Sequence, residues 1–153
     1  MTRDMIDCSI PASLKAEHDE LHRQLADAIK APGAVGEAAR KVAALLHPHF
    51  ADEEAFALPP LGLLAPLARR EPVTNAAAVT IMADRLAAEL PRMLAEHQAI
   101  TAALRELQAV ASDAGDEARA RLADKIIAHA KAEEEVMYPA AILVGRYLKT
   151  IGQ

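Results

Sequence analysis

Apolar side chains recur at every third or fourth position along most of the chain, which is the spacing of one face of an α-helix. A first stripe predicts a helix from about Ser9 to Lys30, and it consists of Leu14, Leu21, Leu25 and Ile29. The same spacing predicts further helices over residues 35–58, 74–112, 117–138 and 140–149. The pattern therefore indicates an all-α protein.

Prolines divide this helical pattern at several points. Pro48 and Pro91 lie inside predicted helices, where the missing N–H is expected to bend the helix. Pro139 is expected to end the fourth long helix, in which Val136 should face inward. Residues 59–72, with the sequence PPLGLLAPLARREP, are apolar but broken by proline and glycine. We expect this segment to be a loop with one short helical turn that packs over the end of the helices.

One stretch of the chain is written twice. Residues 49–59 read HFADEEAFALP and residues 129–139 read HAKAEEEVMYP, and the second copy follows the first by eighty positions without a gap. Upstream in each half, residues 15–18 (KAEH) resemble residues 94–97 (LAEH). Each half thus carries a His on one predicted helix and His-x-x-x-Glu on the next. The repeat indicates a duplicated helix pair, and hence a bundle with pseudo-twofold symmetry.

Composition agrees with a helical protein and narrows its partners. At 153 residues the chain is long enough for an apolar core, so we predict a single domain over residues 1–153. Alanine is abundant, and there are two tyrosines, two phenylalanines and no tryptophan, which favours close-packed helices over a sheet. The net charge is −5 without a basic cluster, which argues against nucleic acid or an anionic membrane as a partner.

The sequence carries no signal for export or membrane insertion. Its first residues, MTRDMIDCSIPASL, lack the apolar core of a signal peptide, and no run approaches the ~20 apolar residues of a membrane span. Cys8 is the only cysteine, so an internal disulfide and a thiolate zinc cage are excluded. We therefore expect a cytoplasmic protein.

Six ionisable residues fall on apolar helix faces and form a candidate metal site. They are His18, His49, Glu53, His97, His129 and Glu133. A single histidine in an apolar stripe is most often a hydrogen-bonded core or surface residue. Here each of the six residues lies on the apolar face of its predicted helix. An ionisable group in such a place is costly unless it is paired or bound to a metal ion, and the whole set is duplicated. Because the His and Glu of each copy stand four apart, they share one face of a helix.

Counting ligands indicates two metal ions. If both glutamates bridge, each ion receives two carboxylate oxygens, and four shared imidazoles give two nitrogens to each. One bridging oxo or hydroxo oxygen brings the count to five, so a sixth position stays open. Mixed nitrogen and oxygen ligands suit iron, and manganese or zinc remain possible.

Neighbours of these six residues are weaker candidates. His22 lies only ~40° from His18 around the helix, so it could supply a further nitrogen ligand or a hydrogen bond. Glu54 and Glu134 stand ~100° from the candidate glutamates, which directs them to solvent or to the outer side of the ligands. Tyr138 is expected near the end of the bundle, as a redox or hydrogen-bonding residue.

Four motifs make the chain resemble a hemerythrin-like protein of the HHE cation-binding class. They are EHDEL, HPHFADEE, EHQAI and HAKAEEEVMYP, in the order of that family's ligand-bearing segments across residues 14–139. The resemblance implies an antiparallel up-down four-helix bundle followed by a short C-terminal helix. It also implies a non-haem di-iron centre with Glu53 and Glu133 as bridging carboxylates. The terminal ligands would be His18, His49, His97 and His129.

The chain departs from the oxygen-carrying hemerythrins in three respects. Those carriers have a fifth His one turn before the third-helix ligand, where this chain has Met93. They use His and Asp five apart on the last helix, where this chain has His129 and Glu133 four apart. Residues 60–91 also resemble an insertion between the second and third helices. We expect this segment to contribute to packing, and a lid or a dimer contact is the alternative. These departures argue against simple reversible oxygen carriage.

Three functions are compatible with this sequence. The leading one is a hemerythrin-like di-iron protein that binds or senses oxygen, nitric oxide or the cellular iron and redox state. The second is a di-iron enzyme that acts on oxygen or peroxide, or that delivers iron for repair of damaged centres. The third is a bundle with a structural ion such as zinc. Because no general base or nucleophile can be named, binding or sensing is favoured over catalysis. A homodimer is left open.

Overall fold

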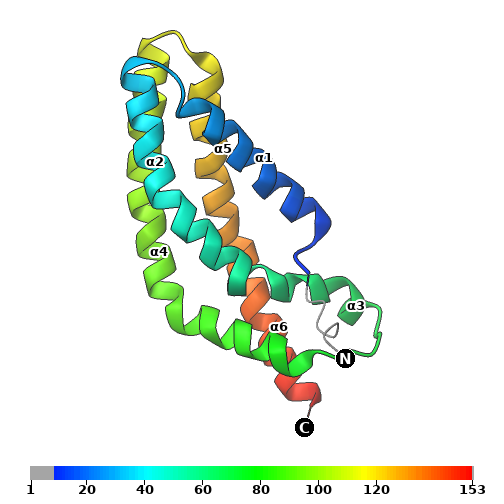
Figure 1. Cartoon of the computed structure of the whole chain (residues 1–153). Helices are drawn as coiled ribbons and strands as arrows, with labels where there is room; N and C mark the ends of the chain where they lie inside the picture. Colours follow the sequence, from blue (N-terminus) through cyan, green and yellow to red (C-terminus); the bar gives the residue numbers. More distant parts are fainter. Residues whose placement is uncertain (1–8, 153) are drawn as a thin grey trace, which may run out of the picture.

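The computed structural model describes residues 9–152, and every regular element in that range is a helix. Four long helices form the body of the molecule and lie side by side, with successive ones running in opposite directions (Figure 1). They are α1 (Ala12–Ala28), α2 (Gly33–Asp52), α4 (Ala76–Asp113) and α5 (Glu117–Ala132). The prediction of an all-α four-helix bundle is confirmed. Cys8 lies outside the described residues.

Both copies of the repeated stretch contain a π-turn. One spans Glu53–Ala57 directly after α2, and the other spans Glu133–Met137 directly after α5. In the first, the Leu58 N–H donates to the Glu53 carbonyl five residues earlier at 2.9 Å, and Tyr138 makes the equivalent bond in the second. A π-turn fits one extra residue into a helical turn and so rotates everything that follows. Leu58 and Tyr138 are consequently buried.

The second π-turn overturns two predictions. Val136 was expected to face inward, but its side chain is 62% exposed, because the extra residue shifts the inward face to Tyr138. Pro139 was expected to end the helix, but α6 (Tyr138–Ile151) continues directly. Pro139 stands in the first turn of α6, where a residue without an N–H is tolerated.

Residues 59–72 fold into two short helical pieces that cover the end of the bundle. A 3₁₀ turn spans Pro59–Leu63 and α3 spans Leu64–Ala68, which is slightly more helix than predicted. Leu61 and Leu63 are buried, and the 3₁₀ turn contacts α4 and α6. The first part of α4 packs against α6 as well, so the segment resembling an insertion contributes to the core.

The longest helix, α4, contains Pro91 and changes direction along its length (Figure 1). This is the bend that the sequence predicts for a proline inside a helix. Neither α4 nor any other helix of residues 9–152 combines the length and apolar character needed to cross a membrane.

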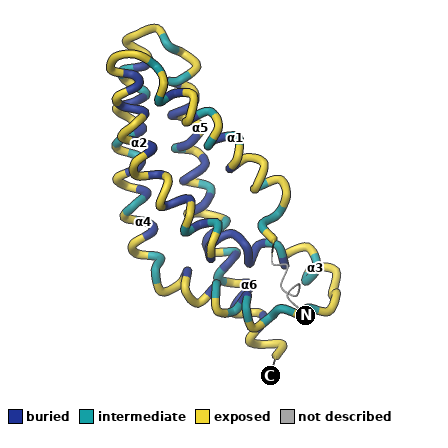
Figure 2. Tube along the Cα trace, viewed as in Figure 1, coloured by how far each residue is buried: buried dark blue, intermediate teal, exposed yellow. Residues whose placement is uncertain are grey.

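The residues that are buried lie on the helix faces that point into the bundle (Figure 2). The apolar ones form two large clusters. The first lies between the long helices and includes Leu25, Val42, Leu104 and Ile126. The second lies towards α6 and includes Phe56, Leu58, Leu86, Met93 and Tyr138. On each long helix the candidate ligands fall between residues of the two clusters along the sequence. The candidate site is thus sandwiched between two apolar layers.

The close approach of α6 to α4 can be tested at Gly145. A methyl group at this position would collide with the side chain of Ala83. We expect Gly145→Ala to lower the free energy of unfolding by about 1–3 kcal/mol through overpacking, which exceeds the ~0.5–1 kcal/mol that removal of a helical glycine returns. Urea unfolding measures the change. Adding Ala83→Gly should recover part of the loss, whereas an unchanged midpoint in the single variant would mean that the two helices do not pack this closely.

Candidate metal centre

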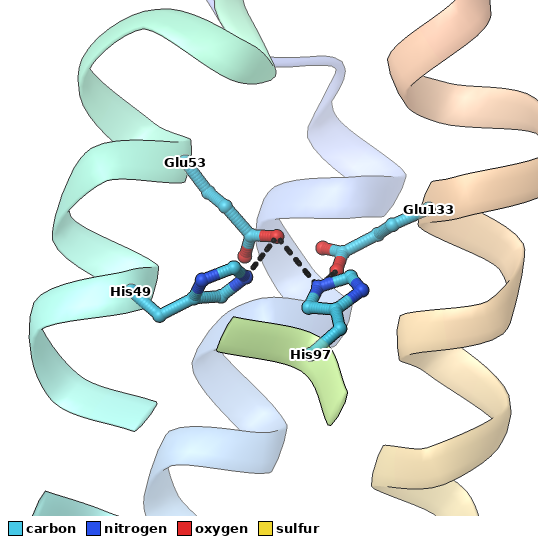
Figure 3. A group of neighbouring side chains, drawn as sticks. All are labelled: His49, Glu53, His97 and Glu133. Atoms are coloured by element: carbon cyan, nitrogen blue, oxygen red, sulfur yellow. Dashed lines mark hydrogen bonds and ion pairs between the residues drawn. The ribbon is translucent and has the colours of Figure 1, made fainter. Parts of the chain in front are cut away.

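The six candidate ligands converge in the middle of the bundle, although they come from all four long helices and the two π-turns. All six are buried, with exposed fractions between 0% for Glu53 and 7% for His129. Figure 3 shows four of them pointing towards one another, with the carboxylates of Glu53 and Glu133 facing the rings of His49 and His97. The structure therefore brings together the whole set that the sequence singles out.

Four of these residues surround what we call the first position. The Nε2 atom of His49 lies 3.1 Å from Glu53 Oε2, and Nε2 of His97 lies 3.2 Å from Glu133 Oε1. His97 Nε2 is also 3.8 Å from Glu53 Oε2. Donor atoms of all four residues lie within 4.8 Å of one another, which is close enough to surround a single cation.

The other two imidazoles surround the second position, together with the remaining carboxylate oxygens. The Nε2 atom of His18 lies 3.1 Å from Glu53 Oε1, and Nε2 of His129 lies 2.9 Å from Glu133 Oε2. His18 Nε2 is 3.9 Å from Glu133 Oε2. Each glutamate thus directs one oxygen to each position, which is the arrangement of a bridging carboxylate.

Every one of the four imidazoles also contacts a second carboxylate through its Nδ1 atom. These outer glutamates are 34–54% exposed. The pairs are His18–Glu54 at 3.0 Å, His49–Glu96 at 2.8 Å, His97–Glu134 at 2.7 Å and His129–Glu17 at 2.9 Å. A carboxylate that accepts the Nδ1–H fixes the tautomer in which Nε2 offers its lone pair to a metal ion.

The outer contacts follow the sequence repeat. Glu54 and Glu134 are counterparts, and each pairs with a histidine of its own half; Glu17 and Glu96 are counterparts, and each pairs with a histidine of the opposite half. For Glu54 and Glu134, the sequence left open whether they face solvent or support the candidate ligands from outside. The structure shows that they contact His18 and His97. Glu17 and Glu96 were missed, although a glutamate directly precedes the candidate histidine in both upstream copies.

Tyr138 lies at the centre of the site and not at the end of the bundle. Its side chain is fully buried, and its O–H donates to Glu53 Oε2. The phenol oxygen also lies 3.3 Å from His49 Nε2 and 3.2 Å from His97 Nε2. The hydrogen-bonding role that the sequence allowed is therefore seen, and the expected location is corrected because the π-turn rotates Tyr138 inward.

The remaining candidate, His22, lies beside the inner cluster formed by the six candidate ligands. The half-buried His22 ring packs edge-on against Phe50 and stacks on His47. Its nitrogen atoms can still approach those of His18 and the carboxylate of Glu54 to within 4.8 Å. His22 therefore lies beside His18 and its outer partner Glu54, and its role as a further nitrogen ligand stays a prediction.

The inner cluster is a set of opposite charges held out of water. Burial lowers the pKa of His97, but hydrogen bonds with Glu133 and Glu53 outweigh it and raise the value to about 10. His129 behaves alike, with a pKa raised to about 9 mainly by Glu133. Burial opposes ionisation of Glu53, yet hydrogen bonds from His18 and His49 hold its pKa well below the ordinary value. Burial and the charge of Glu53 raise the pKa of Glu133.

The donor set fits metal ions. Two inner atoms, His129 Nε2 and Glu133 Oε2, face each other yet lack a well-formed hydrogen bond within the described part of the chain. Buried polar atoms of this kind are unusual unless a ligand or ion satisfies them. Imidazole nitrogens and carboxylate oxygens without thiolates suit iron, manganese or zinc. Whichever of these ions binds, the six inner residues would hold it.

The raised histidine pKa values predict how the metal-free protein responds to alkali. Because His97 and His129 titrate at about 10 and about 9 when folded and at about 6.5 when unfolded, the folded state binds more protons between these values. Its stability should therefore fall as the pH rises from 7 to 10. Urea midpoints in the presence of a chelator measure this loss. Metal-loaded protein is the control, because its imidazoles are already neutral; an equal loss in both forms would contradict the assignment.

Most of the chain matches a known protein family. Residues 9–141 match the family model described as the hemerythrin HHE cation binding domain. The match spans most of the chain and includes all six inner residues, and it agrees with the resemblance carried by the four sequence motifs. Neither the curated proteins nor the solved structures gave a match. This chain belongs to the hemerythrin HHE cation-binding domain family.

Proposed function

We propose that this protein is a non-haem di-iron protein that binds or senses a small diatomic ligand such as oxygen or nitric oxide. The observation that supports it most is the pairing of the inner atoms. Four Nε2 atoms and four carboxylate oxygens divide into two sets of two nitrogens and two oxygens. Four protein donors leave positions free on an ion that takes five or six ligands, and an external ligand can use them.

The chain's own residues divide the work between holding the ions and tuning them. His49 and His97 would hold one ion, His18 and His129 the other, and the two inner glutamates would bridge both. The outer glutamates accept Nδ1–H bonds, so in the neutral imidazole that a metal ion requires they hold the single proton on Nδ1 and aim Nε2 inward. The apolar layers on either side exclude water from the site. Iron bound there would supply affinity for a diatomic ligand and a change of redox state.

Iron content per chain tests the ligand assignment. Protein purified with iron should hold two ions. Glu53→Ala and Glu133→Ala should each empty both positions because each removes a ligand from both ions, whereas His18→Ala should leave one ion bound. Glu135→Ala is the matched control, since Glu135 is exposed in the same π-turn as Glu133. Wild-type protein that binds no iron, or a control that loses as much as Glu53→Ala, would refute the assignment.

The same iron-loaded protein tests the proposed ligand. Adding nitric oxide to the reduced protein without air should change its visible spectrum, because the ligand enters the coordination sphere. A structural ion with a closed sphere would give no change. Turnover of hydrogen peroxide by the loaded protein would instead favour the enzyme alternative.

Substituting an outer carboxylate should weaken metal binding without removing a ligand. Glu96→Gln and Glu17→Gln keep the side-chain size but lose the charge that accepts the Nδ1–H of His49 and His129. We expect iron affinity to fall by about 10–100-fold, as measured by competition with a chelator. Glu106→Gln, on the same helix as Glu96 but paired with Lys41 at the surface, should retain wild-type affinity. Equal affinity in all three variants would show that the outer carboxylates do not act on the site.

A further inference from the structure

Tyr138 distinguishes one half of the site from the other. Its phenol oxygen contacts Glu53 Oε2 and the Nε2 atoms of His49 and His97. These three atoms all belong to the first position. Among the described residues, the phenol makes no hydrogen bond with the imidazoles of His18 or His129, so Tyr138 is a feature of the first position.

The sequence repeat gives the second position no such group. The counterpart of Tyr138, eighty positions earlier, is Leu58. Both residues follow a π-turn directly, and both are buried, with Leu58 1% exposed. The duplicated backbone thus delivers a side chain to the same place in each half, but only Tyr138 carries a polar atom.

An ion at the first position would compete with Tyr138 for its present partners. The lone pairs of His49 Nε2, His97 Nε2 and Glu53 Oε2 are the ones that such an ion would use. A phenol oxygen that is fully buried cannot turn to water instead, and a buried hydroxyl without a partner is costly. Direct coordination, with release of the phenol proton as the ion binds, satisfies the oxygen and the ion together.

A surface groove reaches one residue of the second position from outside. It lies between α1 and α5, has a volume of about 410 Å³ and reaches His129. Leu21, Ala128, Ala132 and Met137 make much of its wall apolar, which suits a small uncharged molecule. His129 Nε2 and Glu133 Oε2, the two inner atoms without a well-formed hydrogen bond, belong to this position.

We propose that the two metal positions are inequivalent: Tyr138 is an additional oxygen ligand that closes the first, and the external ligand binds at the second after entering along the groove at His129. This inference rests on the proposed di-iron function, and it adds the position and the route of the ligand. It assigns the difference between the two halves to a single pair of counterparts, Tyr138 and Leu58.

Spectroscopy of the ferric protein tests the tyrosine ligand. Wild-type protein should show a visible charge-transfer band from phenolate to ferric iron, with phenolate ring modes in its resonance Raman spectrum. Tyr138→Phe should keep two irons and lose both signals. Tyr147→Phe, at the other tyrosine of the chain, which is 50% exposed on α6, should keep them. If the variant at Tyr138 does not fold, ring-deuterated tyrosine in the Tyr147→Phe protein should shift the same modes.

Azide, a small anion that binds ferric ions, reports which position is open. Wild-type protein should bind one azide per chain and Tyr138→Phe should bind two, because removal of the phenol opens the first position. Two azides on the wild type, or one on both proteins, would overturn the proposal. Iron content separates this failure from failure of the proposed function: protein that binds no iron refutes both, whereas two irons without a phenolate signal refute only the tyrosine ligand.

The entry route needs a kinetic test. Ala128→Leu narrows the groove at an exposed position and should slow azide association several-fold while iron content stays unchanged. Ala102→Leu is the matched control, because it is also an exposed alanine that lines a groove, in this case between α2 and α4 and away from the site. Equal association rates in the two variants would contradict entry along the groove at His129.

Discussion

The interior of this bundle must hold two carboxylates and four imidazoles away from water, and the rest of the structure answers that constraint. Glu53 and Glu133 are at most 1% exposed and lie between the imidazoles. Burying ionisable groups is costly unless opposite charges or metal ions compensate. The chain meets this cost by placing each carboxylate oxygen near an imidazole and by closing the layer above and below with apolar side chains.

Compensation extends outwards from the inner layer to the surface. Arg92 contacts Glu96, which contacts His49, so one line of hydrogen bonds runs from solvent to the inner site. The same kind of outer carboxylate serves each of the other three imidazoles. His18, His49 and His97 are therefore hydrogen-bonded at both ring nitrogens and His129 at Nδ1, which fixes ring orientation before any ion binds. An HHE domain with this arrangement is preorganised for metal ions. In the metal-free state, the charges of its buried histidines and glutamates depend on pH.

The two π-turns connect the repeated sequence to its unequal outcome. Each begins at an inner glutamate and ends two residues before a proline, and each directs the residue that follows it inward. A regular α-helix would have turned Val136 inward and left Tyr138 elsewhere. The extra residue in the turn therefore decides that the phenol of Tyr138 faces the first position, whereas its counterpart Leu58 adds only a buried apolar side chain.

The sequence by itself determined the helices, the repeat and all six inner residues, because these depend on short-range spacing: His49 and Glu53 share a helix face wherever that helix lies. Only the tertiary structure decided which imidazole meets which carboxylate. Glu17 and His129 are 112 positions apart, and their contact depends on how α1 packs against α5. The location of Tyr138 within the site was equally hidden, since helical periodicity assumes 3.6 residues per turn and the π-turns depart from it. Local spacing selects the candidate ligands, and packing between helices arranges them.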